Sequence, residues 1–199
     1  MSLVHGTIIC IFLFCCFVGQ VCPQISSPGC PLPVKVQHHF SIERYLGRWN
    51  ELMWVAPEDE KDYDAADYFW LLGNMTHHGT IPIGSSGRDP SSGQCFGGPL
   101  QLQTTNKPGV LLLDTGNGKA ATLVYVMKTD YVTYANVYGC YEYNSDASVC
   151  HNGRAWLWSR ATSLPEKLKH DAVKQWSQLC LDVRTLLKYT PFPGNECPV

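Results

Sequence analysis

The chain has 199 residues and a formal net charge of −2, from 15 basic and 17 acidic residues. This length suits one domain, and a near-neutral charge without a long basic run excludes a protein that tracks nucleic-acid phosphates. The ten cysteines lack the paired short spacings of structural zinc sites. Disulfide bonds in an oxidising compartment are their expected use.

Residues 1–21 predict a secretory signal peptide. Ile8 to Val18 is an apolar run, shorter than the roughly 20 residues that span a bilayer, and polar residues follow it. Cleavage is expected between Gly19 and Cys22, and residues 22–199 then form a single secreted, extracellular domain. Neither nucleic acid nor stable membrane insertion is expected for it.

Many short strands followed by one helix are expected along this domain, which favours an antiparallel barrel over alternating strand-helix units. After the second strand, Asn74-Met75-Thr76 predicts N-glycosylation of Asn74. Between Gly79 and Gly98 the chain is dominated by Gly, Ser and Pro, so a mobile loop is expected there and the third strand is the weakest of the set. The other expected strands are Arg48–Val55, Asp67–Leu72, Pro99–Thr105, Val110–Asp114, Ala121–Met127, Thr133–Tyr143 and Arg154–Arg160.

The helix is expected after Ser163, which forms a capping-box signal with Glu166, and Pro165 lies in its first turn. Leu164, Leu168, Ala172 and Trp176 recur at helical spacing, which predicts an apolar face that packs on the outer wall of the barrel. The tail from Asp182 to Tyr189 then predicts a short edge strand.

Three motifs resemble those of the lipocalin family. They are the run from Tyr45 to Leu52, which contains Gly47 and Trp49; Thr129-Asp130-Tyr131; and Arg160 after two tryptophans. The resemblance implies an all-β, eight-stranded antiparallel up-and-down barrel (calyx) with one C-terminal α-helix packed outside. Gly47 then lets the backbone pass close to a large aromatic ring, and Trp49 fills the closed end. Arg160 covers the Trp49 indole in a cation–π contact of about 0.5–2 kcal/mol.

Within this family the chain resembles the branch of apolipoprotein D and the crustacyanins. The segments Cys30-Pro31-Leu32-Pro33 and Tyr138-Gly139-Cys140 carry that resemblance, which implies a disulfide between Cys30 and Cys140. Cys197 matches the other bridging terminus of the branch, but the position of its usual partner has no cysteine here. Cys197 then pairs with Cys95, Cys150 or Cys180 or remains free. The predicted disulfide cysteines are Cys30, Cys95, Cys140, Cys150, Cys180 and Cys197.

Strand alternation indicates which side chains face the cavity. If Arg160 points inward, Trp156 and Trp158 do too. In the preceding strand only one of two sets of side chains can point inward. One set is Tyr134, Asn136, Tyr138 and Cys140, and the other is Ala135, Val137, Gly139 and Tyr141. The first set is favoured because its hydroxyl and amide groups can orient a ligand. The predicted ligand-binding residues are Tyr68, Trp70, Tyr134, Asn136, Tyr138, Trp156 and Trp158.

Catalysis has weaker support in the sequence. The acidic run from Glu58 to Asp62 has the character of a solvated loop, and adjacent histidines on an extended chain point to opposite sides, so no metal site is predicted. Cys95 lies after the Gly/Ser-rich stretch and has disulfide partners available, which argues against a catalytic thiol.

The predicted function is therefore a non-enzymatic, secreted lipocalin that carries or sequesters a small hydrophobic ligand. The family resemblance suggests a carotenoid, tetrapyrrole, steroid, retinoid or fatty acid. No cofactor is required, and a bound chromophore or lipid would be the cargo. The alternative is a structural component of extracellular matrix or mucus that uses the barrel as a scaffold, and self-association stays open in both cases.

Overall fold

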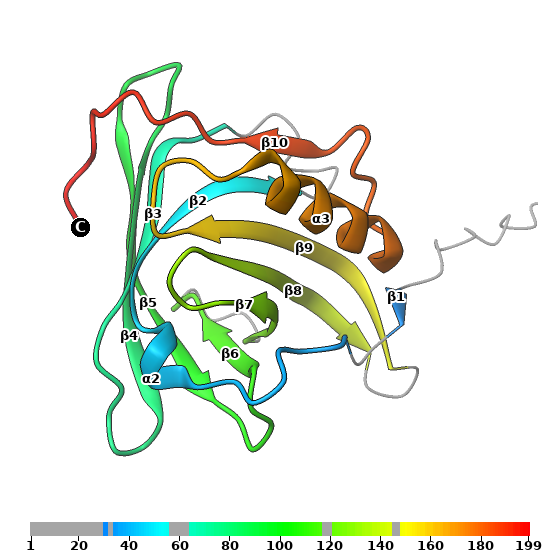
Figure 1. The fold of residues 1–199 in the computed structure, drawn as a ribbon. Coiled ribbons are helices and arrows are strands. Elements are labelled where there is room, and N and C mark those ends of the chain that lie inside the picture. Colours follow the sequence, from blue (N-terminus) through cyan, green and yellow to red (C-terminus); the bar gives the residue numbers. More distant parts are fainter. Residues whose placement is uncertain (1–29, 32–33, 56–63, 117–120, 145–147) are drawn as a thin grey trace, which may run out of the picture.

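Eight antiparallel strands form a closed barrel (Figure 1). The computed structural model describes residues 30–31, 34–55, 64–116, 121–144 and 148–199. Each barrel strand pairs with the next, and the last pairs with the first. The strands are β2 (Gly47–Val55), β3 (Ala66–Leu72), β4 (Thr80–Arg88), β5 (Cys95–Thr104), β6 (Val110–Asp114), β7 (Thr122–Thr129), β8 (Tyr134–Asn144) and β9 (Val149–Ser159).

Shorter elements surround this barrel. The strand β1 (Cys30–Pro31) pairs with β9, and β10 (Leu187–Tyr189) pairs with the second half of β2. The helix α2 (Ile42–Tyr45) precedes β2, whereas α3 (Glu166–Trp176) and the 3₁₀ turn η2 (Ser177–Leu179) follow β9. The predicted all-β barrel with one C-terminal helix outside it is confirmed.

A β-bulge in β2 changes which of its side chains enter the barrel. The register between β2 and β9 shifts between Glu51 and Met53. Trp49 and Trp54 therefore both belong to the interior cluster, although strict alternation would separate them, while Met53 packs outside. The bulge places a second tryptophan of β2 in the calyx.

The Gly/Ser-rich stretch forms regular strand rather than the expected mobile loop. Residues 80–88 are β4, β5 begins at Cys95, and only the short turn between them is irregular. The small residues serve packing: a Cβ atom at Gly87 would lie 2.2 Å from Cδ2 of Tyr68. Glycine thus lets an aromatic ring lie against the strand, and sequence composition alone does not reveal this use.

Helix α3 packs against the outer wall through the predicted apolar face. Leu164, Ala172 and Trp176 are buried there with outward side chains of β2 and β9. The indole N–H of Trp176 donates a 2.6 Å hydrogen bond to Oδ1 of Asn136 in β8. Pro165 is the N-cap residue, so the cap expected at Ser163 does not form.

The C-terminal segment crosses the outer side of β3, β4 and β5. The carboxylate of Asp67 accepts hydrogen bonds from the backbone N–H groups of Gly194 and Asn195, and Ser86 donates to the Cys197 carbonyl. The disulfide Cys95–Cys197 closes this attachment. Cys95 is therefore a structural cysteine, and one of the alternatives left open for Cys197 is confirmed.

The second disulfide corrects a prediction. Cys140 is bonded to Cys150, with their Cα atoms 5.8 Å apart on the adjacent strands β8 and β9, so the predicted Cys30–Cys140 bond is wrong. The backbone of Cys30 does reach this region, because β1 aligns it with Cys150. Cys180 was also predicted to form a disulfide, but it is a free, exposed cysteine.

Some predictions concern segments outside the described residues, namely the signal peptide and the acidic loop 58–62.

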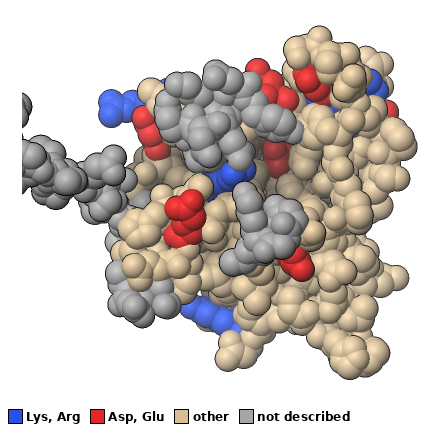
Figure 2. All heavy atoms as spheres, turned by 180° about the vertical axis from the view of Figure 1, so that it is seen from behind, with Lys and Arg blue, Asp and Glu red and all other residues tan. Residues whose placement is uncertain are grey.

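Among the helices that are described, none combines the length and the apolar character needed to cross a bilayer. Figure 2 shows acidic and basic side chains scattered among uncharged residues on the face that it presents.

The two disulfides predict unequal effects on stability. The chain-entropy model relates the stability that a disulfide adds to the length of the loop that it closes. Loss of Cys95–Cys197, whose cysteines are 102 residues apart, should lower the free energy of unfolding by about 4–5 kcal/mol. Loss of Cys140–Cys150, with a separation of 10, should lower it by about 3 kcal/mol. Urea unfolding of the double alanine variants measures this order. Peptide mapping without reduction checks the pairs, and recovery of a Cys30–Cys140 peptide would contradict the assignment.

Candidate ligand-binding site

The closed end of the barrel is sealed by Trp49 and Arg160, which we call the floor. The guanidinium carbon of Arg160 lies 3.5 Å from the centroid of a Trp49 ring, as the sequence predicted. The same guanidinium donates to the backbone carbonyls of Arg48, Leu46 and Tyr131 at 2.7, 2.9 and 3.2 Å. Arg160 is thus held by stacking and by hydrogen bonds at once.

Gly47 and Tyr131 complete the floor. Gly47 has a φ of 93°, and a Cβ atom there would lie 3.3 Å from Nη1 of Arg160, so the close approach is to the guanidinium and not to the indole. In the turn after β7, the Asp130 carboxylate accepts the backbone N–H groups of residues 132–134, and Thr129 accepts that of Tyr131. These bonds hold Tyr131, whose hydroxyl accepts the N–H of Ser41.

Above the floor, toward the other end of the barrel, lies a cavity of about 220 Å³. Its walls come from β2, β3, β8 and β9 and from the residue just before β3. Five of the lining side chains are aromatic, and two are ionisable groups of opposite sign. The lining residues are Glu51, Trp54, Ala65, Tyr68, Trp70, Tyr141, Arg154 and Trp156.

Three predicted ligand contacts line this cavity and a fourth supports it. Tyr68, Trp70 and Trp156 are in the wall. Trp158 belongs to the interior cluster but lies beneath the wall, with its ring centroid 5.5 Å from that of Trp70 and 6.2 Å from that of Tyr45. Trp158 therefore connects the cavity to the floor.

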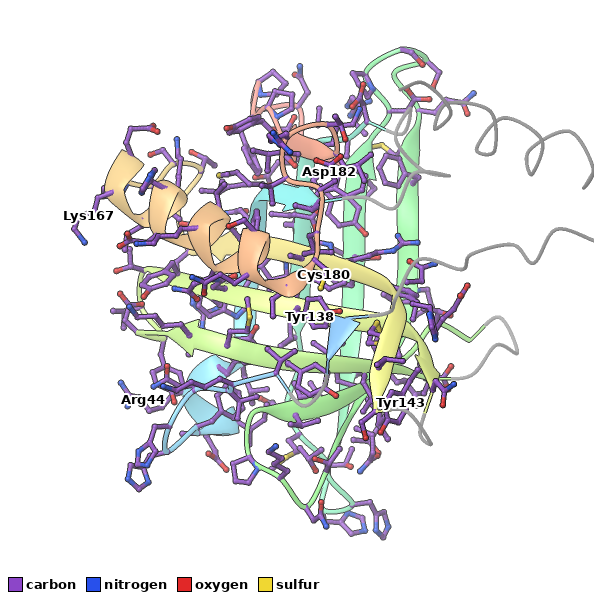
Figure 3. The ribbon with its side chains drawn as sticks, turned by 90° about the vertical axis from the view of Figure 1, so that its right-hand side faces the viewer. Arg44, Tyr138, Tyr143, Lys167, Cys180 and Asp182 are labelled. Carbon is purple, nitrogen blue, oxygen red and sulfur yellow. A yellow bond between two sulfur atoms is a disulfide. The ribbon has the colours of Figure 1, made fainter. Side chains whose placement is uncertain are left out.

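Tyr134, Asn136 and Tyr138 point out of the barrel, so their predicted placement in the pocket is wrong. Tyr134 packs in the cluster beneath α3, and Tyr138 packs in another outer cluster; Figure 3 shows it on the side that carries β1 and Cys180. Asn136 binds Trp176 of α3. Both faces of β8 are buried, so its polar pattern does not distinguish inside from outside.

The inward residues of β8 are instead Ala135, Val137, Gly139 and Tyr141, the set that the sequence left as the alternative. A Cβ atom at Gly139 would lie 2.7 Å from the Trp156 ring, so glycine makes room for that indole. Tyr141 also lines the cavity, with its ring centroid 6.3 Å from that of Trp156.

Glu51 and Arg154 are site residues that the sequence reasoning missed. Arg154 has the same strand parity as Trp156 and Arg160, and Glu51 has that of Trp49, so alternation could have identified both. Trp54 could not have been found in this way, because its inward position depends on the bulge.

The two charged groups differ in how they are held. Glu51 is buried, and its Oε2 accepts a 2.9 Å hydrogen bond from the indole N–H of Trp70. Burial raises the pKa of Glu51 to about 7, against the lowering effects of the Trp70 hydrogen bond and the Arg154 charge. Arg154 lies over the Tyr141 ring, with its guanidinium carbon 4.2 Å from the ring centroid.

Other predicted positions lie away from the calyx. Asn74 is exposed in the loop between β3 and β4, where a glycan would be accessible, so its glycosylation stays a prediction. Two pairs of adjacent histidines, His38 with His39 and His77 with His78, bring their rings within 3.8 Å. No group of three metal-ligating side chains occurs in the described part of the chain.

Comparison with known proteins agrees with this geometry. The chain is 28% identical to apolipoprotein D from Oryctolagus cuniculus over 138 residues, which cover 68% of each chain. No protein-family profile matches the chain. The similarity and the closed eight-stranded barrel with its outer helix together confirm the lipocalin resemblance.

The floor predicts energetic coupling between its two large side chains. Trp49→Ala should cost roughly 3–5 kcal/mol, the range for deletion of a buried aromatic side chain. In a double-mutant cycle, Trp49→Leu and Arg160→Leu should show a coupling of about 0.5–2 kcal/mol. Urea unfolding gives the four free energies, and additive losses would mean that the stacking contributes nothing.

The raised pKa of Glu51 predicts that stability falls as the pH rises. Below pH 4.5 the carboxyl is protonated in both states, but between 4.5 and about 7 the folded protein keeps a proton that the unfolded chain has released. This difference removes about 3 kcal/mol of stability by pH 8. Glu51→Gln should lack this loss, while the exposed control Glu142→Gln should retain it. Parallel pH profiles of wild type and Glu51→Gln would contradict the assignment.

Proposed function

We propose that this protein is a secreted carrier that binds a small hydrophobic molecule in its calyx and releases it unchanged. The similarity to apolipoprotein D and the lipocalin-type barrel support hydrophobic ligand binding in general. The observation that carries the proposal is the aromatic cavity between Trp70 and Trp156. Aromatic walls with a few polar groups are typical of sites that hold and orient a small ligand.

The cavity's dimensions narrow the class of ligand. Its 220 Å³ lies below the 300–1,000 Å³ typical of sites for drug-sized molecules, so the cargo is a compact molecule or a narrow chain. Flat indole and phenol surfaces favour ligands with a planar or unsaturated apolar part. Retinoids, fatty acids and small steroids meet these conditions better than an extended carotenoid or a tetrapyrrole.

Secretion is supported by two disulfides, which persist in oxidising compartments. The proposed carrier catalyses no reaction. The polar groups of the cavity wall serve only to orient the ligand. The alternative, a structural protein that uses the barrel as a scaffold, does not need a cavity. Binding of a ligand in the calyx with a defined stoichiometry would reject this alternative.

A bound apolar ligand should quench tryptophan fluorescence through contact with Trp156 and Trp70. Trp156→Ala removes stacking area and should weaken binding by about 1–3 kcal/mol, or roughly tenfold to a hundredfold. Tyr189→Ala removes an exposed aromatic ring outside the barrel and is the matched control. A titration with retinoids, fatty acids, steroids, carotenoids and bilins tests the proposal, and it fails if no compound binds the folded wild type.

A further inference from the structure

The C-terminal tail (residues 190–199) is attached directly behind one wall of the cavity. Figure 1 shows this tail, in red, running past β3, β4 and β5. In β3, the buried carboxylate of Asp67 accepts hydrogen bonds of 3.1 and 3.0 Å from the backbone N–H groups of Gly194 and Asn195. The next residue, Tyr68, lines the cavity. The tail thus holds the residue that precedes an aromatic ring of the wall.

The other two strands behind the tail repeat this arrangement. In β5, Cys95 is joined to the tail by a disulfide, and the following Phe96 lies against Tyr68 with a ring-centroid distance of 5.6 Å. In β4, Ser86 donates hydrogen bonds to carbonyls of the tail, and the following Gly87 leaves the space that the Tyr68 ring needs. In each of three strands, therefore, a residue that binds the tail is followed by one that shapes the Tyr68 wall.

The backbone at Asp67 depends on these contacts. Its φ of 50° is left-handed, a conformation that residues other than glycine keep only where their surroundings impose it. The strand is also bulged there, because its register with β4 shifts between Ala66 and Phe69. The Asp67 N–H donates instead to the Pro191 carbonyl of the tail, at 2.8 Å. Contacts with the tail therefore fix the strand immediately before Tyr68.

The disulfide that fastens the tail is the more accessible of the two. Cys95 is an exposed residue, whereas Cys140 and Cys150 of the other disulfide are only 1% and 3% exposed. Thiol–disulfide exchange requires that a thiolate reach one of the sulfurs. A small dithiol should therefore reduce the bond at Cys95 well before the buried bond.

We propose that the Cys95–Cys197 disulfide is a thiol-sensitive latch on the calyx, and that its reduction frees the tail and lowers the affinity for the cargo. A thiolate of a dithiol attacks the Cys95 sulfur, the S–S bond breaks, and Cys197 leaves as a thiolate. The second thiol of the reagent resolves the mixed disulfide and releases Cys95. The protein disulfide gains two electrons and the two protons of the dithiol, which becomes a cyclic disulfide. This inference rests on the proposed function, because it concerns ligand affinity.

The expected effect is a loss of affinity without unfolding. Once the tail is free, nothing imposes the left-handed conformation of Asp67, so the Tyr68 wall no longer keeps one position. Apparent affinity falls with the fraction of molecules whose wall is in the binding position, and a fraction near one tenth gives about a tenfold loss. None of the floor contacts described above involves the tail, so the barrel should stay closed.

The test reduces the latch selectively in the full-length protein, after free thiols have been blocked with N-ethylmaleimide. Brief treatment with dithiothreitol, then iodoacetamide and peptide mapping, should show alkylated Cys95 and Cys197 beside an intact Cys140–Cys150 bond. Retinol, dodecanoic acid and testosterone are titrated by tryptophan quenching before and after reduction, and far-UV circular dichroism reports the fold. Each compound that binds the oxidised protein should bind the reduced protein about tenfold more weakly. Protein treated with N-ethylmaleimide alone is the control.

A variant with an intact disulfide separates the latch from a general loss of stability. Asp67→Asn tolerates the left-handed backbone but loses one of the two carboxylate acceptors, so it should weaken binding by about threefold to tenfold without any reductant. The exposed control Asp114→Asn should not. Reduction of Asp67→Asn should bring its affinity only to that of the reduced wild type, because both changes release the same tail.

Unchanged affinity after selective reduction would overturn the latch and leave the carrier proposal standing. If reduction unfolds the barrel, Asp67→Asn decides, and wild-type affinity in that variant overturns the inference. Reduction of both disulfides at the same rate would also overturn it. Failure of the three compounds and of the wider panel to bind the oxidised protein would overturn both proposals.

Discussion

The contact between Arg160 and Trp49 is the constraint on which the rest of the barrel depends. It joins the first and last barrel strands at their closed end, and the guanidinium donates to carbonyls of the segment that leads into β2 and of the turn after β7. Burial of even part of a guanidinium is costly unless its donors are satisfied, so each of these carbonyls stabilises the charge of the half-buried Arg160 and is itself fixed in place. The floor therefore closes one end of the barrel and leaves the opposite end to form the cavity. Trp158 connects the floor to the cavity, because its ring packs on Trp70 of the cavity wall and on Tyr45, which in turn packs on Trp49.

The cavity exists because large rings are placed beside glycines and beside a bulge. Gly87 and Gly139 give space to Tyr68 and Trp156, and the bulge in β2 turns Trp54 inward. These rings line a space instead of filling it, since each is packed against a strand. The burial of Glu51 among them raises its pKa and keeps the local charge dependent on pH. The stability of the fold is thus linked to pH through one carboxyl group.

The floor could be predicted because the motifs that contain its residues resemble those of lipocalins. That resemblance implied a contact between Trp49 and Arg160 beside Gly47, and the structure has this contact. Alternation in β9 also placed Trp156 and Trp158 inside. It failed in β8, where α3 and the amino-terminal segment cover the outer face, so Tyr138 is as well buried outside as Val137 is inside. Alternation can separate the two faces of a strand only when one of them meets solvent. The disulfide at Cys140 was missed for a different reason, since the resemblance pointed to Cys30 while the adjacent strand supplied Cys150.

A crystal structure of the protein purified from its natural source would show whether the calyx holds a ligand. Electron density for one organic molecule is expected inside the calyx, with its apolar part against Trp70 and Trp156. Mass spectrometry of an organic extract of the same preparation would identify that molecule. Density for ordered water alone in the cavity, together with an extract that contains no organic compound in stoichiometric amount, would show that the protein is not a carrier and would favour a barrel that serves as a scaffold.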